Sequence, residues 1–350
     1  MGKHSRKCSA VEVASVDPAK VGEPGGECIL AIDVAKKGMK AGFADGAGRV
    51  MKLVRFEHPE QTPAFLELVG RVVGRGVKVR ATMEPTGSYG DALRYQLRRL
   101  GVEVRRVSAN RTYHEAIVYD GQYSWHDGKS VCVIAALEAQ GRSQPWEPRP
   151  AEAGRLGALT EQRAAHELTL EQYTGRMEGK LARYWPEIMG HWNCVSVLRV
   201  LAKYGGPGGV AAQVGQVREQ LRKESRGLLS EATIELVVGS ACRTLGEPMD
   251  QSQEQALANW AKEMLRLWRL VNGLDQELAK AVVTSESGRH LAELVGVALA
   301  AAILAAGLDP RSYERAGGLE KAMGLSLRER SSGKHQGQLK ITKQGPGCSC

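Results

Sequence analysis

The sequence predicts an α/β domain, followed by a long helical region and a small helical domain. Between residues 27 and 148, short apolar runs with strand spacing alternate with helical segments, which is typical of a mixed sheet covered by helices. Residues 149–287 contain almost no strand pattern and include two long stretches with helical spacing. Residues 288–350 begin with small apolar side chains and continue as a basic segment rich in Ser and Gly.

The first domain is expected to contain three strands, a helix, a strand, a helix, a further strand and two helices. The turn signal Asp45–Gly46 predicts that the second and third strands form an antiparallel hairpin. Pro63 fits the first turn of a helix, and glycines follow the apolar helical stretches. The expected strands are residues 28–34, 41–44, 50–56, 77–83 and 102–107, and the expected helices are 62–74, 91–100, 111–119 and 127–140.

Two segments flank this domain and carry no strand or helix pattern. Residues 1–26 are polar and contain Pro18, Pro24 and paired glycines, so we expect a flexible leader. Residues 143–148 hold two prolines and are expected to be a linker.

The composition favours a nucleic-acid partner and argues against several other classes of protein. The net charge of the 350 residues is +9, and a basic balance favours binding to polyanions. Seven cysteines without a C-x-x-C pair argue against a zinc module and a disulfide framework, which indicates a reducing, cytoplasmic compartment. No apolar run is long enough for a membrane span, and no apolar segment follows the charged N-terminus as in a signal peptide.

The middle of the chain is expected to form two long helices, at residues 158–184 and 252–283. The second helix keeps near-heptad spacing of its apolar residues, which is typical of a coiled coil. The two helices either pack on each other as an antiparallel hairpin or also form an arm for dimerisation, and the sequence leaves both interpretations open.

Three carboxylates are placed where sheet-based sites usually lie. Asp33 ends the first apolar strand, Glu84 ends a later strand, and Asp127 begins a helix expected to cover the same sheet. Carboxylates from several elements at one sheet edge are typical of Mg²⁺ sites for phosphodiester chemistry. Each acid also has a structural alternative, because Asp33 could cap a turn, Glu84 could pair with Arg80 or Arg94, and Asp127 could cap its helix.

The segment around Ser332 combines hydroxyls with basic residues. A flexible basic loop of this kind contacts phosphate groups well, and an ordinary mobile surface loop is the alternative. The basic residues are Arg328, Arg330, Lys334, His335, Lys340 and Lys343.

Several motifs, taken in order, resemble one group of insertion-sequence transposases related to the pilin-gene inverting recombinases. They are AIDVAKK from residue 31, MEPTGSYG from residue 83, HDGKSVCVIA from residue 126 and GGLEKAMGLSLRERSSGKHQGQLKITKQG from residue 317. The resemblance covers residues 27–148 and 288–345. It implies a RuvC-like, RNase H-type domain with a DEDD tetrad, a helical spacer, and a helix-hairpin-helix-like stretch before a serine-bearing motif.

The resemblance also implies roles for individual residues. Asp33, Glu84 and Asp127 match three of the four acids and would hold Mg²⁺, and Ser332 matches a serine that forms a phosphoserine link to DNA. The implied activity is DNA strand cleavage and exchange by a transposase or site-specific recombinase. The implied partners are DNA, a guide RNA encoded by the element, and further copies of the chain in a dimer or tetramer.

Two departures from the family pattern affect this interpretation. The fourth acid of the family lies three residues after the third, where this chain has Ser130; Asp120 and Glu138 are candidate substitutes, but neither has the right spacing. The chain also ends five residues after Gly345, so we expect part of the C-terminal domain to be absent. A RuvC-like nuclease or resolvase without a serine step, a degenerate copy that only binds nucleic acid, and a basic helical scaffold of unrelated fold are the alternatives.

Overall fold

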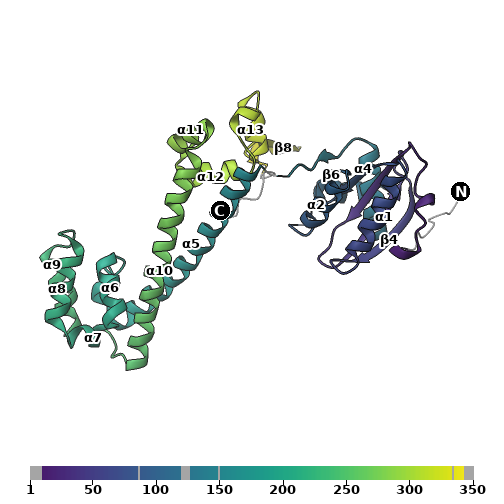
Figure 1. The fold of residues 1–350 in the computed structure, drawn as a ribbon. Coiled ribbons are helices and arrows are strands. Elements are labelled where there is room, and N and C mark those ends of the chain that lie inside the picture. Colours follow the sequence, from purple (N-terminus) through teal and green to yellow (C-terminus); the bar gives the residue numbers. More distant parts are fainter. Residues whose placement is uncertain (1–9, 86, 120–126, 149, 333–334, 343–350) are drawn as a thin grey trace. The chain divides into compact units, whose positions relative to one another are not determined.

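The fold is given by a computed structural model that describes residues 10–85, 87–119, 127–148, 150–332 and 335–342. The chain divides into two compact units, Met1–Pro148 and Arg149–Cys350. The first unit contains a sheet with helices, and the second is mostly helical (Figure 1). Asp120 and the hairpin tip at 333–334 lie outside the described residues.

A mixed sheet of seven strands forms the first unit, in the order β1-β4-β3-β2-β5-β6-β7. The hairpin of β2, β3 and β4 is antiparallel, whereas β5 and β6 run parallel to β2. This confirms the mixed sheet that the alternating strand and helix patterns predict. The strands are β1 (Val11–Glu12), β2 (Glu27–Asp33), β3 (Gly38–Ala44), β4 (Val50–Glu57), β5 (Lys78–Met83), β6 (Glu103–Arg106) and β7 (Gln144–Pro145).

Helices cover both faces of this sheet because its central strands are apolar on both sides. On one face, Leu30 and Ile32 of β2 pack with helices α1 (Thr62–Gly74) and α2 (Asp91–Arg99). On the other face, Ile29 and Ala31 pack with α3 (Ala109–Tyr119) and α4 (Asp127–Ala139). The alternation along β2 therefore separates two buried layers.

The prediction of a flexible leader is wrong for its described part, residues 10–26. Strand β1 pairs in parallel with β4, and Val13, Val16 and Val21 are buried in the same core as α1. The Arg75 guanidinium donates to the carbonyl oxygens of Pro18 and Gly22. Three valines in a polar, proline-containing segment are too few to give a periodic signal, yet they are enough to cover an apolar helix face.

The expected linker at residues 143–148 is also part of the domain. Strand β7 pairs with β6, and Trp146 is buried beside the Arg94 guanidinium, whose carbon lies 4.8 Å from the ring centroid. Proline is tolerated here because β7 is an edge strand of the sheet.

The second unit is organised by two long antiparallel helices, α5 (Ala151–Tyr184) and α10 (Gln251–Val282). Leu181 near the end of α5 shares a core with Leu257 near the start of α10. Leu156 and Leu278 share a second core at the opposite ends of these helices. The helices that complete the first of these cores are α6 (Val195–Tyr204), α7 (Pro207–Ala211), α8 (Val214–Ser225) and α9 (Glu231–Ala241), together with the short helix η3 (Pro186–Ile188) (Figure 1).

The end of the chain contains helices, as the sequence predicts, but it also contains a strand hairpin. Helices α11 (Glu286–Val295), α12 (Val297–Ala305) and α13 (Ala316–Ala322), with the short helix η4 (Pro310–Ser312), are followed by strands β8 (Leu327–Ser332) and β9 (His335–Ile341). These strands form an antiparallel hairpin with Leu327 opposite Ile341, where a loop was expected. The sequence pattern does not predict these strands because their residues are mostly polar.

No helix within the described ranges is both long and apolar enough to cross a lipid bilayer.

Candidate active site

Two acids lie side by side at the carboxyl edge of the sheet. Strand β2 ends at Asp33, and Glu84 directly follows the last residue of β5. These strands are parallel neighbours, and Ile32 is in register with Met83. Asp33 and Glu84 are therefore the next pair along, at the edge where ligands of α/β sheets usually bind.

Both acids also continue the strand positions that face α4. Ile29 and Ala31 of β2 pack on the face of the sheet that α4 covers. Because side chains alternate between the two faces of a strand, Asp33 belongs to the same face. On β5, the Thr82 hydroxyl reaches α4, and Glu84 lies two residues further along. Asp33 and Glu84 are each half-buried, which leaves them accessible from solvent.

Helix α4 points its N-terminal end toward the same edge. Val131 packs against Gly42, which pairs with Ala31, whereas Ala135 and Ala139 pack against Gly48 in the turn before β4. The helix thus runs antiparallel to β2, and Asp127 is its first residue. The Asp127 side chain lies outside the described residues. Among the side chains that are described, no group of three His, Cys, Asp or Glu residues forms a metal cluster.

The structural alternatives for Glu84 are not found in the structure. The Arg80 guanidinium pairs with Glu27 and Glu138, and Arg94 pairs with Asp91. Within the described part of the chain, Glu84 forms no ion pair. Its position at the strand end is therefore not explained by neutralisation with either arginine.

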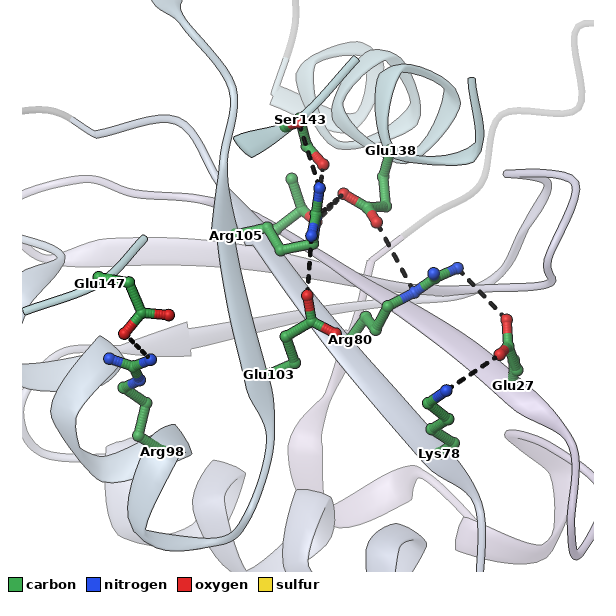
Figure 2. A network of polar contacts seen from close by, with 10 residues as sticks. Glu27, Lys78, Arg80, Arg98, Glu103, Arg105, Glu138, Ser143 and Glu147 are labelled. Carbon is green, nitrogen blue, oxygen red and sulfur yellow. Dashed lines mark hydrogen bonds and ion pairs between the residues drawn. The ribbon is translucent and has the colours of Figure 1, made fainter. Parts of the chain in front are cut away.

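Glu138, a candidate for the fourth acid, instead forms a buried clamp at the opposite end of α4 (Figure 2). Its carboxylate is only 4% exposed and accepts a hydrogen bond of 2.7 Å from the Thr82 hydroxyl. The Arg105 Nε lies 3.4 Å from it and the Arg80 Nε 3.7 Å. A buried carboxylate with two cations and a hydroxyl is neutralised, so Glu138 ties α4 to β5 and β6 and is not available as a metal ligand.

The Arg105 side chain extends this clamp beyond α4. It donates to the Ser143 hydroxyl at 2.7 Å and forms an ion pair of 2.8 Å with Glu103. The sequence does contain a signal for the clamp, namely a Thr and a Glu at positions that otherwise belong to apolar faces of β5 and α4. The hydrophobic periodicity of the sequence alone does not distinguish Thr82 and Glu138 from polar residues on the surface.

Ser130, at the position where the family resemblance implies a fourth acid, is buried. Ser130 is 5% exposed, one turn after the start of α4, and it lies next to Val131 of the sheet-facing layer. A hydroxyl there adds no negative charge. The described residues therefore provide two acids at this edge, with a third at the start of α4.

Cys28 and Ser332 have side chains that can act as nucleophiles. Burial raises the pKa of the Cys28 thiol to about 11, so this thiol stays protonated at neutral pH. Ser332 is the last residue of β8 and is in register with His335 across the hairpin. The Ser332 side chain is outside the described residues, and the hairpin belongs to the second unit.

Comparison with known protein families defines the class of this protein as a transposase. Residues 30–186 match the IS110-type DEDD transposase model, whose description is "Transposase". Residues 287–347 match a second model, described as "Transposase IS116/IS110/IS902 family". The two matches cover the sheet domain and the serine-bearing end in the expected order, and the chain belongs to the IS110 family of insertion-sequence transposases. No curated protein sequence matches the chain.

Proposed function

We propose that this transposase cleaves and rejoins DNA through a Mg²⁺-dependent step in which Ser332 becomes linked to the DNA. The observation that carries the proposal is the pairing of Asp33 and Glu84 at the ends of parallel strands, on the face covered by α4. Asp127 at the start of that helix would complete a three-acid site.

The residues at this edge fit a divalent cation by their chemistry. Asp33, Glu84 and Asp127 supply only oxygen ligands, which suit Mg²⁺, and the half-buried edge leaves room for water ligands. A bound cation would stabilise the negative charge that develops on a phosphate group during strand cleavage. A divalent cation between two neighbouring carboxylates would also reduce their mutual repulsion.

The proposed serine step is a transesterification that needs no oxidant or nucleotide. The Ser332 oxygen forms a bond to phosphorus, one P–O bond of the DNA strand breaks, and the released DNA hydroxyl gains the proton that the serine loses. A DNA hydroxyl from another end then attacks the phosphoserine and restores the serine. The number of phosphodiester bonds is conserved, which suits strand exchange.

The test of the metal site is the yield of covalent protein–DNA adduct with element DNA and Mg²⁺. Asp33→Asn should abolish the adduct, and chelation of the metal should do the same to the unmodified protein. Glu27→Gln is the matched control because Glu27 lies at the opposite end of the same strand, where it pairs with Lys78 and Arg80. Full adduct yield with Asp33→Asn would refute the metal site.

The serine step is tested by a pair of neighbouring variants. Ser332→Ala should give no adduct, whereas Ser331→Ala on the same strand should retain it. If Ser332→Ala still cleaves DNA and leaves free ends, the protein acts as a nuclease with water as the nucleophile. Cleavage without adduct in the unmodified protein would lead to the same conclusion.

Ser130 gives a specific reason to consider a degenerate copy that only binds nucleic acid. A site with three acids holds fewer charges for the cation than the four-acid pattern of the family. Ser130→Asp should raise adduct yield, or lower the Mg²⁺ concentration needed, if the neutral residue limits activity. Binding of DNA without adduct in both forms would favour the non-catalytic alternative.

We further propose that an RNA encoded by the element guides target choice and that the protein acts as a dimer or tetramer. The basic net charge of +9 supports contact with nucleic acid. Addition of the RNA flanking the gene should make cleavage depend on the paired sequence. Sedimentation with and without that RNA would give the number of chains in the complex.

A further inference from the structure

A shallow depression between α6 and α10 is surrounded by basic side chains. Arg199 and Lys203 come from α6, and Lys262 comes from α10. The depression has a volume of about 370 Å³, and its remaining lining is apolar, from Ala202 and Leu265. We refer to Arg199, Lys203 and Lys262 as the α6–α10 cation cluster.

The charges of this cluster are only partly neutralised. The Arg199 guanidinium lies 3.2 Å from the Glu224 carboxylate, and the Lys203 ammonium lies 4.7 Å from the centroid of the Tyr204 ring. The described residues that line the depression include no acid. Two lysines thus remain without a carboxylate partner there.

Other cations of the same helical bundle are neutralised one by one. Arg218 pairs with Glu235 at 2.7 Å, and Arg222 pairs with Glu231 at 2.8 Å. Arg218 and Arg222 therefore each have a carboxylate partner, whereas no described ion pair includes Lys203 or Lys262. Cations that converge from two helices repel one another unless an anion lies between them.

Helix-end electrostatics explains only one member of the cluster. Lys203 lies in the last turn of α6, where a cation is favoured by the helix dipole. Lys262 lies in the interior of α10 and has no such stabilisation. The half-buried Leu265 beside it reduces local solvation, which strengthens the attraction of the cluster for an anion.

We infer that the α6–α10 cation cluster binds phosphate groups of a nucleic-acid backbone. This inference rests on the nucleic-acid partner of the proposed function and adds a binding surface remote in sequence from the acids and the serine. Lysines and an exposed arginine on rigid helices contact phosphates without reading bases. The apolar floor provides no donors for base edges, so the contact should be independent of sequence.

The test is the salt dependence of binding, measured by fluorescence anisotropy in EDTA. The double variant Lys203→Gln with Lys262→Gln removes two positive charges without changing buried side chains. For duplex DNA, the slope of log affinity against log salt should fall by about 1.8, because each phosphate contact contributes about 0.9. Affinity in 0.1 M salt should then fall by roughly 60-fold, if the affinity extrapolated to 1 M is unchanged.

The matched control is the double variant Lys223→Gln with Arg243→Gln. Both residues are exposed cations of the same bundle outside the depression, so net charge changes equally. The inference predicts a much smaller change of slope for the control. Equal changes in both double variants, or no change in either, would refute it, provided that thermal unfolding of the variants is unaltered.

Parallel titrations distinguish the source of the phosphate and the class of partner. If the Lys203→Gln, Lys262→Gln variant loses affinity for duplex DNA, the cluster binds the DNA. If it loses affinity for single-stranded element RNA, the cluster binds the RNA. A loss seen only with polyglutamate would show that the cluster binds an acidic protein and would refute the inference. Because binding is measured in EDTA, failure of the metal site or of Ser332 leaves this result unaffected.

Discussion

Two carboxylates on the same face of the sheet, Glu138 and Glu84, have sharply different surroundings. Under the C-terminal part of α4, Glu138 is buried and is neutralised by Arg80, Arg105 and the Thr82 hydroxyl. At the carboxyl edge, Glu84 lies beside Asp33, is half-buried and forms no ion pair within the described residues. The same residue type on the same face is thus neutralised in one place and left with its charge in the other.

The difference shows that surroundings, and not residue type, separate a structural acid from a candidate ligand. A carboxylate that already has two cations gains little from a metal ion, and its removal takes the buried partner from two half-buried arginines. Acids that lie side by side at an accessible edge can share a cation as oxygen ligands. Substitution of Glu138 should therefore mainly lower stability, whereas substitution of Asp33 or Glu84 should mainly lower activity.

The largest expected effect is on chemistry, from Glu84→Gln. We expect the rate of adduct formation to fall roughly a thousandfold, because a ligand of the cation that stabilises phosphate charge is lost. The free energy of unfolding in EDTA should be unchanged or slightly higher, since one of two like charges is removed. Adduct formation is followed on denaturing gels, and unfolding is followed in urea. A large loss of stability would show that Glu84 is structural, like Glu138.

The opposite response is expected from Glu138→Ala. We expect the free energy of unfolding to fall by about 3 kcal/mol, because Arg80 and Arg105 lose their buried partner. Urea unfolding of the purified chain measures this loss. Glu138→Gln keeps an acceptor for Thr82 and should be less damaging. An unchanged stability of Glu138→Ala would remove the distinction between the two groups of acids.

A smaller effect should come from Gly42→Ala, which tests how closely α4 approaches the sheet. A Cβ at Gly42 would lie 2.5 Å from Cγ1 of Val131 and 3.1 Å from Cγ1 of Val50. We expect a loss of about 2 kcal/mol from overpacking and a shift of α4 that also lowers adduct yield. Gly46→Ala in the nearby turn is the control, because its Cβ would meet no atom within 4 Å.

The smallest effect concerns Asp45, an acid in the turn between β3 and β4. The hydrogen bond that its carboxylate accepts from the Arg49 backbone N–H, at 2.9 Å, lowers the pKa of Asp45 below 3.8. Because the folded-state pKa is lower than the unfolded one, the stabilisation is present above about pH 4 and is lost as pH falls through the folded-state pKa. Asp45→Asn should cost about 1 kcal/mol at pH 6 and show a weaker decline in melting temperature between pH 5 and 2.

Much of the sheet domain could be predicted from local patterns. The run Ile29–Ile32 is apolar on both sides, which predicts a central strand, and its end places an acid at an edge. Pro63 and the glycines after helical faces predicted α1 and its end at Gly74. The placement of Asp33 and Glu84 at strand ends is predictable for the same reason, because the end of an apolar run is visible in a sequence.

Contacts between segments distant in sequence were not predictable in this way. Val13 and Val16 lie in a segment that the sequence predicts to be a leader, because a few apolar residues have no period, yet they pack in the same core as α1. Strands β8 and β9 were missed because pairing between backbones needs no apolar pattern. The clamp of Glu138 joins residues of α4, β5 and β6 that are far apart in the chain.

The sequence by itself determined the central strands and helices of the sheet domain and which acids end those strands, since both follow from local spacing and turn chemistry. Only the tertiary structure decided which acid is neutralised. Asp33 and Glu84 become neighbours through the parallel register of β2 and β5, and Glu138 meets two arginines through the packing of α4. The free energy of a carboxylate depends on the charges and solvent around it, and those are set by packing across the fold.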